Sequence, residues 1–82
     1  MNYGKIFALN LKRIRLAKGL SQDELGAQCG LTRNYIGNIE RQENSPSLQS
    51  MEAVADALGV SLLDLFEQPD QKQPPDLKSD GL

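Results

Sequence analysis

Apolar side chains recur at helical spacing over residues 4–18. Phe7, Leu11 and Ile14 fall on one stripe, while lysine and arginine side chains occupy other faces. A spacing of three or four residues is that of one face of an α-helix. The sequence therefore predicts a first amphipathic helix that ends at Gly19.

Ser21 and Glu24 predict the start of a second helix. A serine followed three residues later by a glutamate is the capping-box pattern, in which each side chain accepts a hydrogen bond from the backbone N–H of the other residue. We expect this helix to end at about Cys29, because Gly30 readily takes the left-handed conformation that follows a helix.

Thr32 is the candidate cap of a third helix. After it, Ile36, Ile39 and Glu40 recur at the spacing of a buried helix face. The sequence thus predicts a helix over residues 32–41, which follows the second helix after a short turn.

Ser47 and Ser61 are candidate caps of two further helices, which end at Gly59 and Phe66. The inner face of the fourth helix carries Leu48, Met51, Val54, Ala55 and Leu58. The fifth segment adds Val60, Leu62, Leu65 and Phe66 to the core. The pattern predicts an all-α fold, a compact five-helix domain over residues 1–66.

The composition changes at residue 67. Residues 67–82 are rich in Pro, Gln and Asp and contain almost nothing to bury, so we expect a disordered acidic tail. This tail is interpreted as a solvated end. The alternative is a partner-binding segment with Leu77 and Leu82 as its apolar contacts.

Charge is distributed unevenly along the 82 residues. The net charge of -2 by itself argues against a nucleic-acid partner. However, residues 1–41 carry seven Lys and Arg against three Asp and Glu, whereas residues 42–82 carry two against eight. The basic half can therefore face DNA while the acidic half lies away from it.

The chain contains no His and a single cysteine, Cys29. This excludes an intramolecular disulfide and a thiolate metal site, and it leaves little for acid–base catalysis. Cys29 is interpreted as a small core residue rather than a redox group. No apolar stretch approaches the roughly 20 residues that cross a bilayer. We expect a cytoplasmic protein that is not an enzyme and has no cofactor, metal, membrane contact or small-molecule substrate.

Residues 22–41 meet the requirements of a helix-turn-helix, in which the second helix packs across the first and presents its opposite face to the major groove. Gly26 permits the two helices to approach closely, Gly30 makes the turn, and Leu31 anchors the turn in the core. The buried positions of the third helix then place its polar residues outward.

Arg33, Asn34 and Asn38 on that outer face are the candidate base-reading residues. Arginine binds a guanine edge through two hydrogen bonds, and asparagine binds adenine in the same way. Gly37 on the same face is expected to leave room for close approach to the bases. A merely solvated face would more often carry Glu and Lys.

Candidate contacts to the DNA backbone surround this face: Gln22, Thr32, Tyr35, Arg41, Asn44 and Ser47. Gln22 lies in the first turn of its helix, where backbone N–H groups attract phosphate. Tyr35 either donates its hydroxyl to a phosphate or packs against the first helix. Glu43, in the following loop, is repelled by DNA unless it points away.

Arg15 and Glu40 each interrupt an otherwise apolar helix face. A buried charge needs a partner. We therefore expect the two side chains to pair and to tie the first helix to the third.

Leu63 and Phe66 are the candidate dimer contacts. The last helix offers four large apolar side chains, of which at most three can face the core at helical spacing. Leu63 is left over, although it could instead fill the core.

Five stretches resemble the Cro/C1-type helix-turn-helix family, also called the XRE family: Leu-Lys-Arg-Ile-Arg at 11–15, Leu-Ser-Gln-Asp-Glu-Leu at 20–25, Leu-Thr-Arg-Asn-Tyr-Ile at 31–36, Ile-Glu-Arg at 39–41 and Pro-Ser-Leu at 46–48. Within the family, Arg-Asn-Tyr-Ile-Gly-Asn-Ile-Glu-Arg at 33–41 is similar to the controller proteins of restriction-modification systems. The resemblance implies a lambda-repressor-like fold, a two-fold dimer and a bacterial or phage origin. By position, it also implies base reading by Arg33, Asn34 and Asn38, backbone contacts by Gln22 and Tyr35, and a buried pair of Arg15 with Glu40.

This sequence departs from the family after the third helix. Gln-Glu-Asn-Ser at 42–45 stands where the family often has a loop that starts with Gly and carries basic residues. The contacts of this loop with the DNA backbone are therefore expected to be weaker.

Taken together, the sequence predicts a sequence-specific DNA-binding transcription regulator that binds a palindromic operator as a homodimer through residues 32–41. The alternative is an antitoxin or antirepressor, a protein-interaction module of the same fold.

Overall fold

The computed structural model describes residues 2–68, and this part of the chain contains four α-helices and one 3-10 helix. They are α1 (Tyr3–Ala17), α2 (Gln22–Cys29), α3 (Arg33–Glu40), α4 (Leu48–Leu58) and η1 (Leu62–Phe66). The predicted all-helical class is confirmed, but the prediction of five α-helices is wrong in its last element. That element has five residues, and such short segments commonly adopt the tighter hydrogen bonding of a 3-10 helix.

The predicted acidic tail lies outside the described residues, apart from Glu67 and Gln68.

A side-chain cap begins each of the five described elements. Ser21 Oγ accepts a hydrogen bond from the Glu24 N–H at 2.9 Å, and the Glu24 carboxylate accepts one from the Ser21 N–H at 2.8 Å. This is the predicted capping box. Thr32 and Ser47 each accept a hydrogen bond from the backbone N–H three residues ahead. The helix starts therefore follow from local hydrogen bonding that the sequence specifies.

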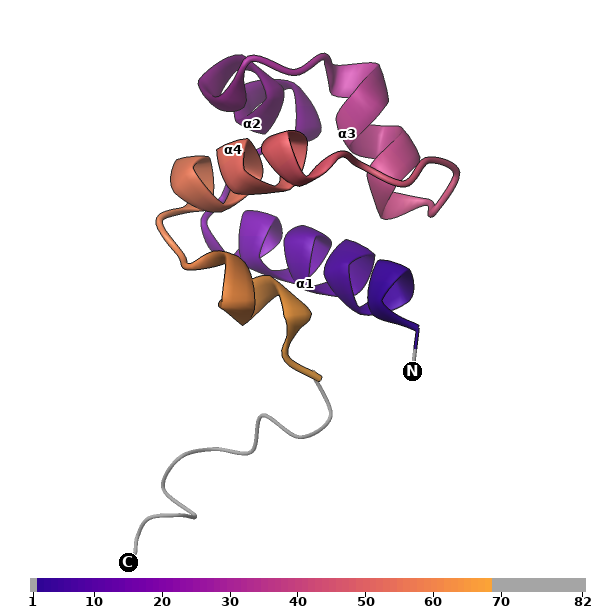
Figure 1. The fold of residues 1–82 in the computed structure, drawn as a ribbon. Helices are drawn as coiled ribbons and strands as arrows, with labels where there is room; N and C mark the ends of the chain where they lie inside the picture. Colours follow the sequence, from indigo (N-terminus) through magenta and orange to yellow (C-terminus); the bar gives the residue numbers. More distant parts are fainter. Residues whose placement is uncertain (1, 69–82) are drawn as a thin grey trace, which may run out of the picture.

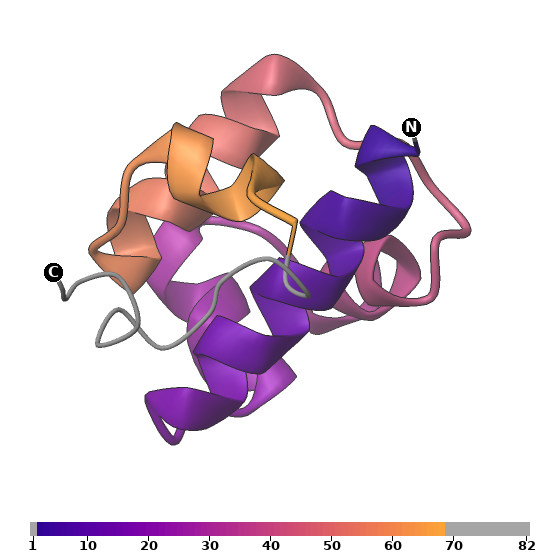
Figure 2. The same ribbon diagram turned by 90° about the horizontal axis from the view of Figure 1, so that it is seen from below.

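The helices form two groups that meet along α4. Figure 1 shows α2 and α3 on one side of α4 and α1 on the other, with η1 below α4. Figure 2, seen from below, shows η1 running alongside α1, with which it packs. α3 also contacts α1, so its position depends on both groups.

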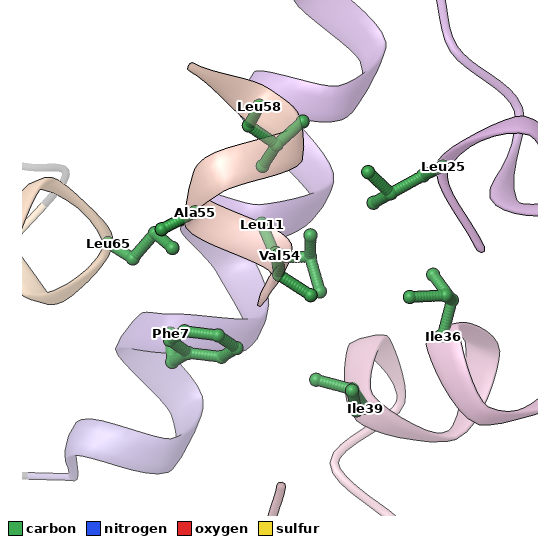
Figure 3. Packing of buried hydrophobic residues seen from close by; sticks show 9 residues of the cluster. All are labelled: Phe7, Leu11, Leu25, Ile36, Ile39, Val54, Ala55, Leu58 and Leu65. Carbon is green, nitrogen blue, oxygen red and sulfur yellow. The ribbon is translucent and has the colours of Figure 1, made fainter. Parts of the chain in front are cut away.

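One hydrophobic core joins all five elements (Figure 3). Leu25 of α2 and Ile36 of α3 point toward Leu58 and Val54 of α4, and all four are at most 1% exposed. The other members of the buried cluster are Phe7, Leu11, Ile39, Ala55 and Leu65. Because helices of eight residues are marginal in isolation, this shared burial is what stabilises α2 and α3.

A buried polar side chain fastens η1 to α1. Asn10 is completely buried, and its Nδ2 donates to the carbonyl oxygens of Leu65 at 2.9 Å and Glu67 at 2.7 Å. The pattern of apolar positions does not single out this residue. A signal was available, because Asn10 lies three positions after Phe7 on the buried face of the helix, where a polar group needs a partner.

Candidate nucleic-acid interface

α2 and α3 approach each other closely at Gly26. The turn between them consists of residues 30–32, and the Leu31 N–H donates to the Gly26 carbonyl at 2.9 Å. A Cβ on Gly26 would lie only 2.5 Å from the Leu31 carbonyl oxygen. The close packing that the sequence predicted at this glycine is therefore present, and it fixes how α3 crosses α2.

The three predicted base-reading residues lie on the outer side of α3. Arg33 and Asn34 are exposed in its first turn, and Asn38 is half-buried one turn further on. The inward face carries Ile36 and Ile39, which are at most 2% exposed. α3 thus has one apolar face in the core and one polar face available to a partner.

Arg41 directly follows α3 and is held by two neighbours. Its Nε donates to Glu43 Oε2 at 3.1 Å, and its Nη2 donates both to Glu43 Oε1 at 3.3 Å and to Asn38 Oδ1 at 2.5 Å. The arginine and glutamate side chains are 53% and 57% exposed. Glu43 therefore does not point away from the predicted interface but pairs with a cation at its edge.

Gln22 faces α3 from the first turn of α2. Its Nε2 donates to Glu40 Oε1 at 3.0 Å, so the donor half of its amide is bonded within the protein. Together with Arg33, Asn34, Gly37 and Arg41, it lines a surface hollow of about 260 Å³.

Gly37 is less exposed than the sequence predicts. The sequence predicted an open position on the outer face, but Gly37 is buried beneath neighbouring side chains. A Cβ at this residue would lie 3.0 Å from Arg41 Nη1 and 3.4 Å from Gln22 Oε1. Long polar side chains from both ends of the motif thus reach over the glycine, an arrangement that helical spacing alone does not reveal.

Arg15 and Glu40 form the expected ion pair. Arg15 Nε lies 2.7 Å from Glu40 Oε2, and Arg15 Nη2 donates to Glu40 Oε1 at 3.1 Å. The remaining guanidinium nitrogen, Nη1, donates to the Leu20 carbonyl at 2.7 Å. The side chains are only 7% and 4% exposed. This pair holds the end of α3 against α1, and Arg15 also binds the loop residue Leu20 between α1 and α2.

The other predicted backbone contacts surround this face. Tyr35 is half-buried and packs against the core. Asn44 and Ser47 are exposed in and after the loop that follows α3. The hydroxyls of Thr32 and Ser47 act as helix caps, as described above.

Cys29 is half-buried at the end of α2 and packs against the core. Burial raises the pKa of its thiol above the ordinary value, because the thiolate loses solvation. A thiol of this kind is a poor nucleophile at neutral pH.

Within residues 2–68 there is no group of His, Cys, Asp or Glu side chains arranged to hold a metal ion. No helix in the same range has the length and apolarity needed to cross a membrane.

The model of the helix-turn-helix family HTH_3 matches residues 11–65. The chain belongs to this family. Residues 11–65 include the Arg15–Glu40 pair, both helices of the motif and most of the core. Membership gives the chain the fold of a DNA-binding transcription regulator.

The relatives by sequence carry names of the same kind. The Neisseria hypothetical transcription factor from Neisseria meningitidis is 39% identical over 67 residues, which are 82% of this chain and 63% of the relative. The control protein C.BamHI from Bacillus amyloliquefaciens is 39% identical over 67 residues, which are 80% of this chain and 83% of the relative. The chain thus spans less than two thirds of the Neisseria relative but most of the control protein.

A solved structure gives the same result. The restriction-modification controller protein C.AhdI from Aeromonas hydrophila is 38% identical and superposes with a TM-score of 0.75, over 77% of this chain and 96% of that one. The similarity therefore extends over nearly the whole of a controller protein of this type.

Proposed function

We propose that this protein is a sequence-specific transcription regulator that binds a palindromic operator as a homodimer, with α3 in the major groove. The observation that carries the proposal is the outer face of α3, where Arg33, Asn34 and Asn38 lie together on a helix whose opposite face is locked into the core. These are the side-chain types that read guanine and adenine edges.

In this proposal Arg33 reads guanine, while Asn34 and Asn38 read adenine. Asn44 and Ser47, beside α3, contact phosphate, and Thr32 and Tyr35 contribute near the start of the helix. Glu43 lowers the attraction of this edge for DNA by neutralising Arg41. The contacts of this edge with the DNA backbone are therefore weak, and base readout contributes a large share of the specificity.

Dimerisation through η1 completes the proposal. Leu63 is 76% exposed, whereas Leu62, Leu65 and Phe66 pack against the core of their own chain. Phe66 contacts Phe7 with ring centroids 5.5 Å apart, so only its outer part is available to a second copy. A two-fold dimer doubles the few base contacts of each copy and requires half-sites about one helical turn apart.

The test is selection of bound sequences from a pool of random duplexes, followed by gel-shift titration of the selected duplex against an unrelated one. Arg33→Lys keeps the charge but loses the two-pronged guanine contact. We expect it to retain salt-sensitive binding to any DNA and to lose the preference for guanine at one position, a cost of about 1–3 kcal/mol.

Lys12→Ala is the control, because it removes a cation from the exposed surface of α1. It should leave the sequence preference unchanged. Binding that falls with salt but shows no preferred duplex would contradict sequence-specific readout.

A further inference from the structure

We infer that the hollow over Gly37 is a reading site for a single adenine, in which Gln22 accepts a hydrogen bond and Arg41 donates one. The inference rests on the proposed function and deepens it, because it moves these two residues from backbone contact to base recognition. It depends on the orientation of both side chains in the protein without DNA.

The hollow is lined by Gly37, which has no side chain, and by Gln22, Arg33, Asn34 and Arg41. It has a volume of about 260 Å³ and lies on the outer side of α3, between Gln22 on α2 and Arg41 at the end of α3. Gln22 Oε1 and Arg41 Nη1 both lie within 3.4 Å of the point that a Cβ on Gly37 would occupy. An acceptor and a donor therefore flank the same small space.

The orientation of the Gln22 amide is determined by its partner. The Glu40 side chain is 4% exposed and is paired with Arg15, so its carboxylate is ionised and can only accept hydrogen bonds. The amide nitrogen of Gln22 must therefore face Glu40, as the 3.0 Å contact shows, and the amide oxygen must face the hollow. A phosphate offers only acceptors, so this oxygen cannot bind one.

The orientation of Arg41 is determined in a similar way. Its Nε and Nη2 donate to Glu43 and Asn38. Among the hydrogen bonds of residues 2–68, none leaves from Arg41 Nη1, which is the nitrogen beside Gly37. Glu43 therefore does more than reduce the attraction to DNA: it directs the remaining donor of Arg41 into the hollow.

Adenine is the base that matches an acceptor beside a donor. Its major-groove edge presents the N6 amino group next to the N7 acceptor, whereas guanine presents two acceptors, N7 and O6. A guanine would place its O6 opposite Gln22 Oε1. Both atoms are hydrogen-bond acceptors, so they would repel each other. Cytosine offers only a donor and thymine only an acceptor with a methyl group, so neither satisfies both side chains.

The decisive variant is Gly37→Ala, which places one methyl group in the hollow beside Gln22 and Arg41. The nearest atom is the far end of the flexible Arg41 side chain, and alanine is the better helix former, so the variant should fold at least as well as the wild type. Gly4→Ala, in the first turn of α1 and with no atom nearer than 3.5 Å, is the matched control.

Both variants and the wild type are titrated against the selected duplex and against copies carrying a base analogue at each adenine in turn. 7-Deazaadenine lacks the N7 acceptor, and purine lacks the 6-amino group. At one adenine per half-site we expect each analogue to weaken the wild type and Gly4→Ala by about fivefold or more. Gly37→Ala should bind the unmodified duplex more weakly and should not respond to either analogue there.

Gln22→Met separates the two contacts and does not depend on the glycine variant. It should lose the response to purine at that adenine and keep the response to 7-deazaadenine, because Arg41 is still present. Equal responses of the wild type and Gly37→Ala at every adenine would overturn the inference and leave the proposed function intact. A guanine whose recognition is lost in Gly37→Ala would have the same consequence. A wild type without any preferred duplex would instead remove the proposed function and the inference together.

Discussion

The guanidinium of Arg15 and the carboxylate of Glu40 meet at 2.7 Å in the interior, 25 residues apart along the chain. The contact joins α1 to the last residue of α3. Both carboxylate oxygens and all three guanidinium nitrogens have hydrogen-bond partners, because Gln22 and the Leu20 carbonyl complete the set. α3 is therefore positioned by an ion pair whose hydrogen-bonding groups are all satisfied, as well as by the apolar core.

Glu40→Ala should destabilise the protein by about 3–5 kcal/mol, because it leaves the Arg15 charge buried without its partner. The matched control is Glu43→Gln, which breaks the exposed pair with Arg41 and should cost at most about 1 kcal/mol. Urea unfolding followed by circular dichroism measures both. Similar small losses in the two variants would show that the buried pair does not hold the fold.

Gly26→Ala should also destabilise the protein, through sterics rather than charge. The added Cβ would lie 2.5 Å from the Leu31 carbonyl oxygen, a backbone atom that cannot rotate away. Overpacking of this kind costs about 1–3 kcal/mol, of which the better helix propensity of alanine recovers a part. Thermal unfolding against Gly4→Ala is the measurement, and equal transition temperatures would contradict the close approach of α2 to the turn.

Asn10→Leu should loosen η1 without disrupting the helix-turn-helix. The substitution keeps the side-chain volume roughly constant but leaves the carbonyls of Leu65 and Glu67 without this donor. A buried acceptor that loses its donor costs about 1–3 kcal/mol. Amide hydrogen exchange should rise in peptides that cover residues 62–67 more than in those that cover α2 and α3. A uniform rise over the whole chain would indicate that Asn10 stabilises the fold globally.

Leu63→Glu should weaken self-association while leaving the monomer folded, since the side chain is 76% exposed. Loss of one buried leucine per copy lowers the dimer association constant by about tenfold or more. Leu16→Glu makes the same change at a 57% exposed leucine on α1 and serves as the control. Sedimentation equilibrium separates the two, and an equal effect of both variants would place the dimer contact elsewhere.

The helices could be predicted from sequence because their signals are local. Ser21 with Glu24, Thr32 and Ser47 each cap a helix through a hydrogen bond to a backbone N–H three residues away. The last element was misjudged because its apolar pattern and its cap at Ser61 suit an α-helix and a 3-10 helix equally well. Its type depends on a length of only five residues before the chain becomes extended at Glu67.

The positions of the polar side chains can likewise be predicted where they depend on local geometry, but not where they depend on a distant partner. Periodicity alone puts Arg33 and Asn34 outside and Glu40 inside, because every residue of a helix has a fixed direction relative to its neighbours. It says nothing of the partner of Gln22, which lies 18 residues away, or of Asn10, whose acceptor Leu65 lies 55 residues away.

The sequence by itself therefore determined the family, through motifs spread over residues 11–48, and also the helix starts and the outward face of α3, which depend on residues within a turn or two of one another. Only the tertiary structure decided that Glu40 turns the oxygen of Gln22 toward Gly37 and that Glu43 and Asn38 aim Arg41 at the same point. Long polar side chains have many rotamers, and the one that is occupied is selected by charged groups that folding brings within hydrogen-bonding distance.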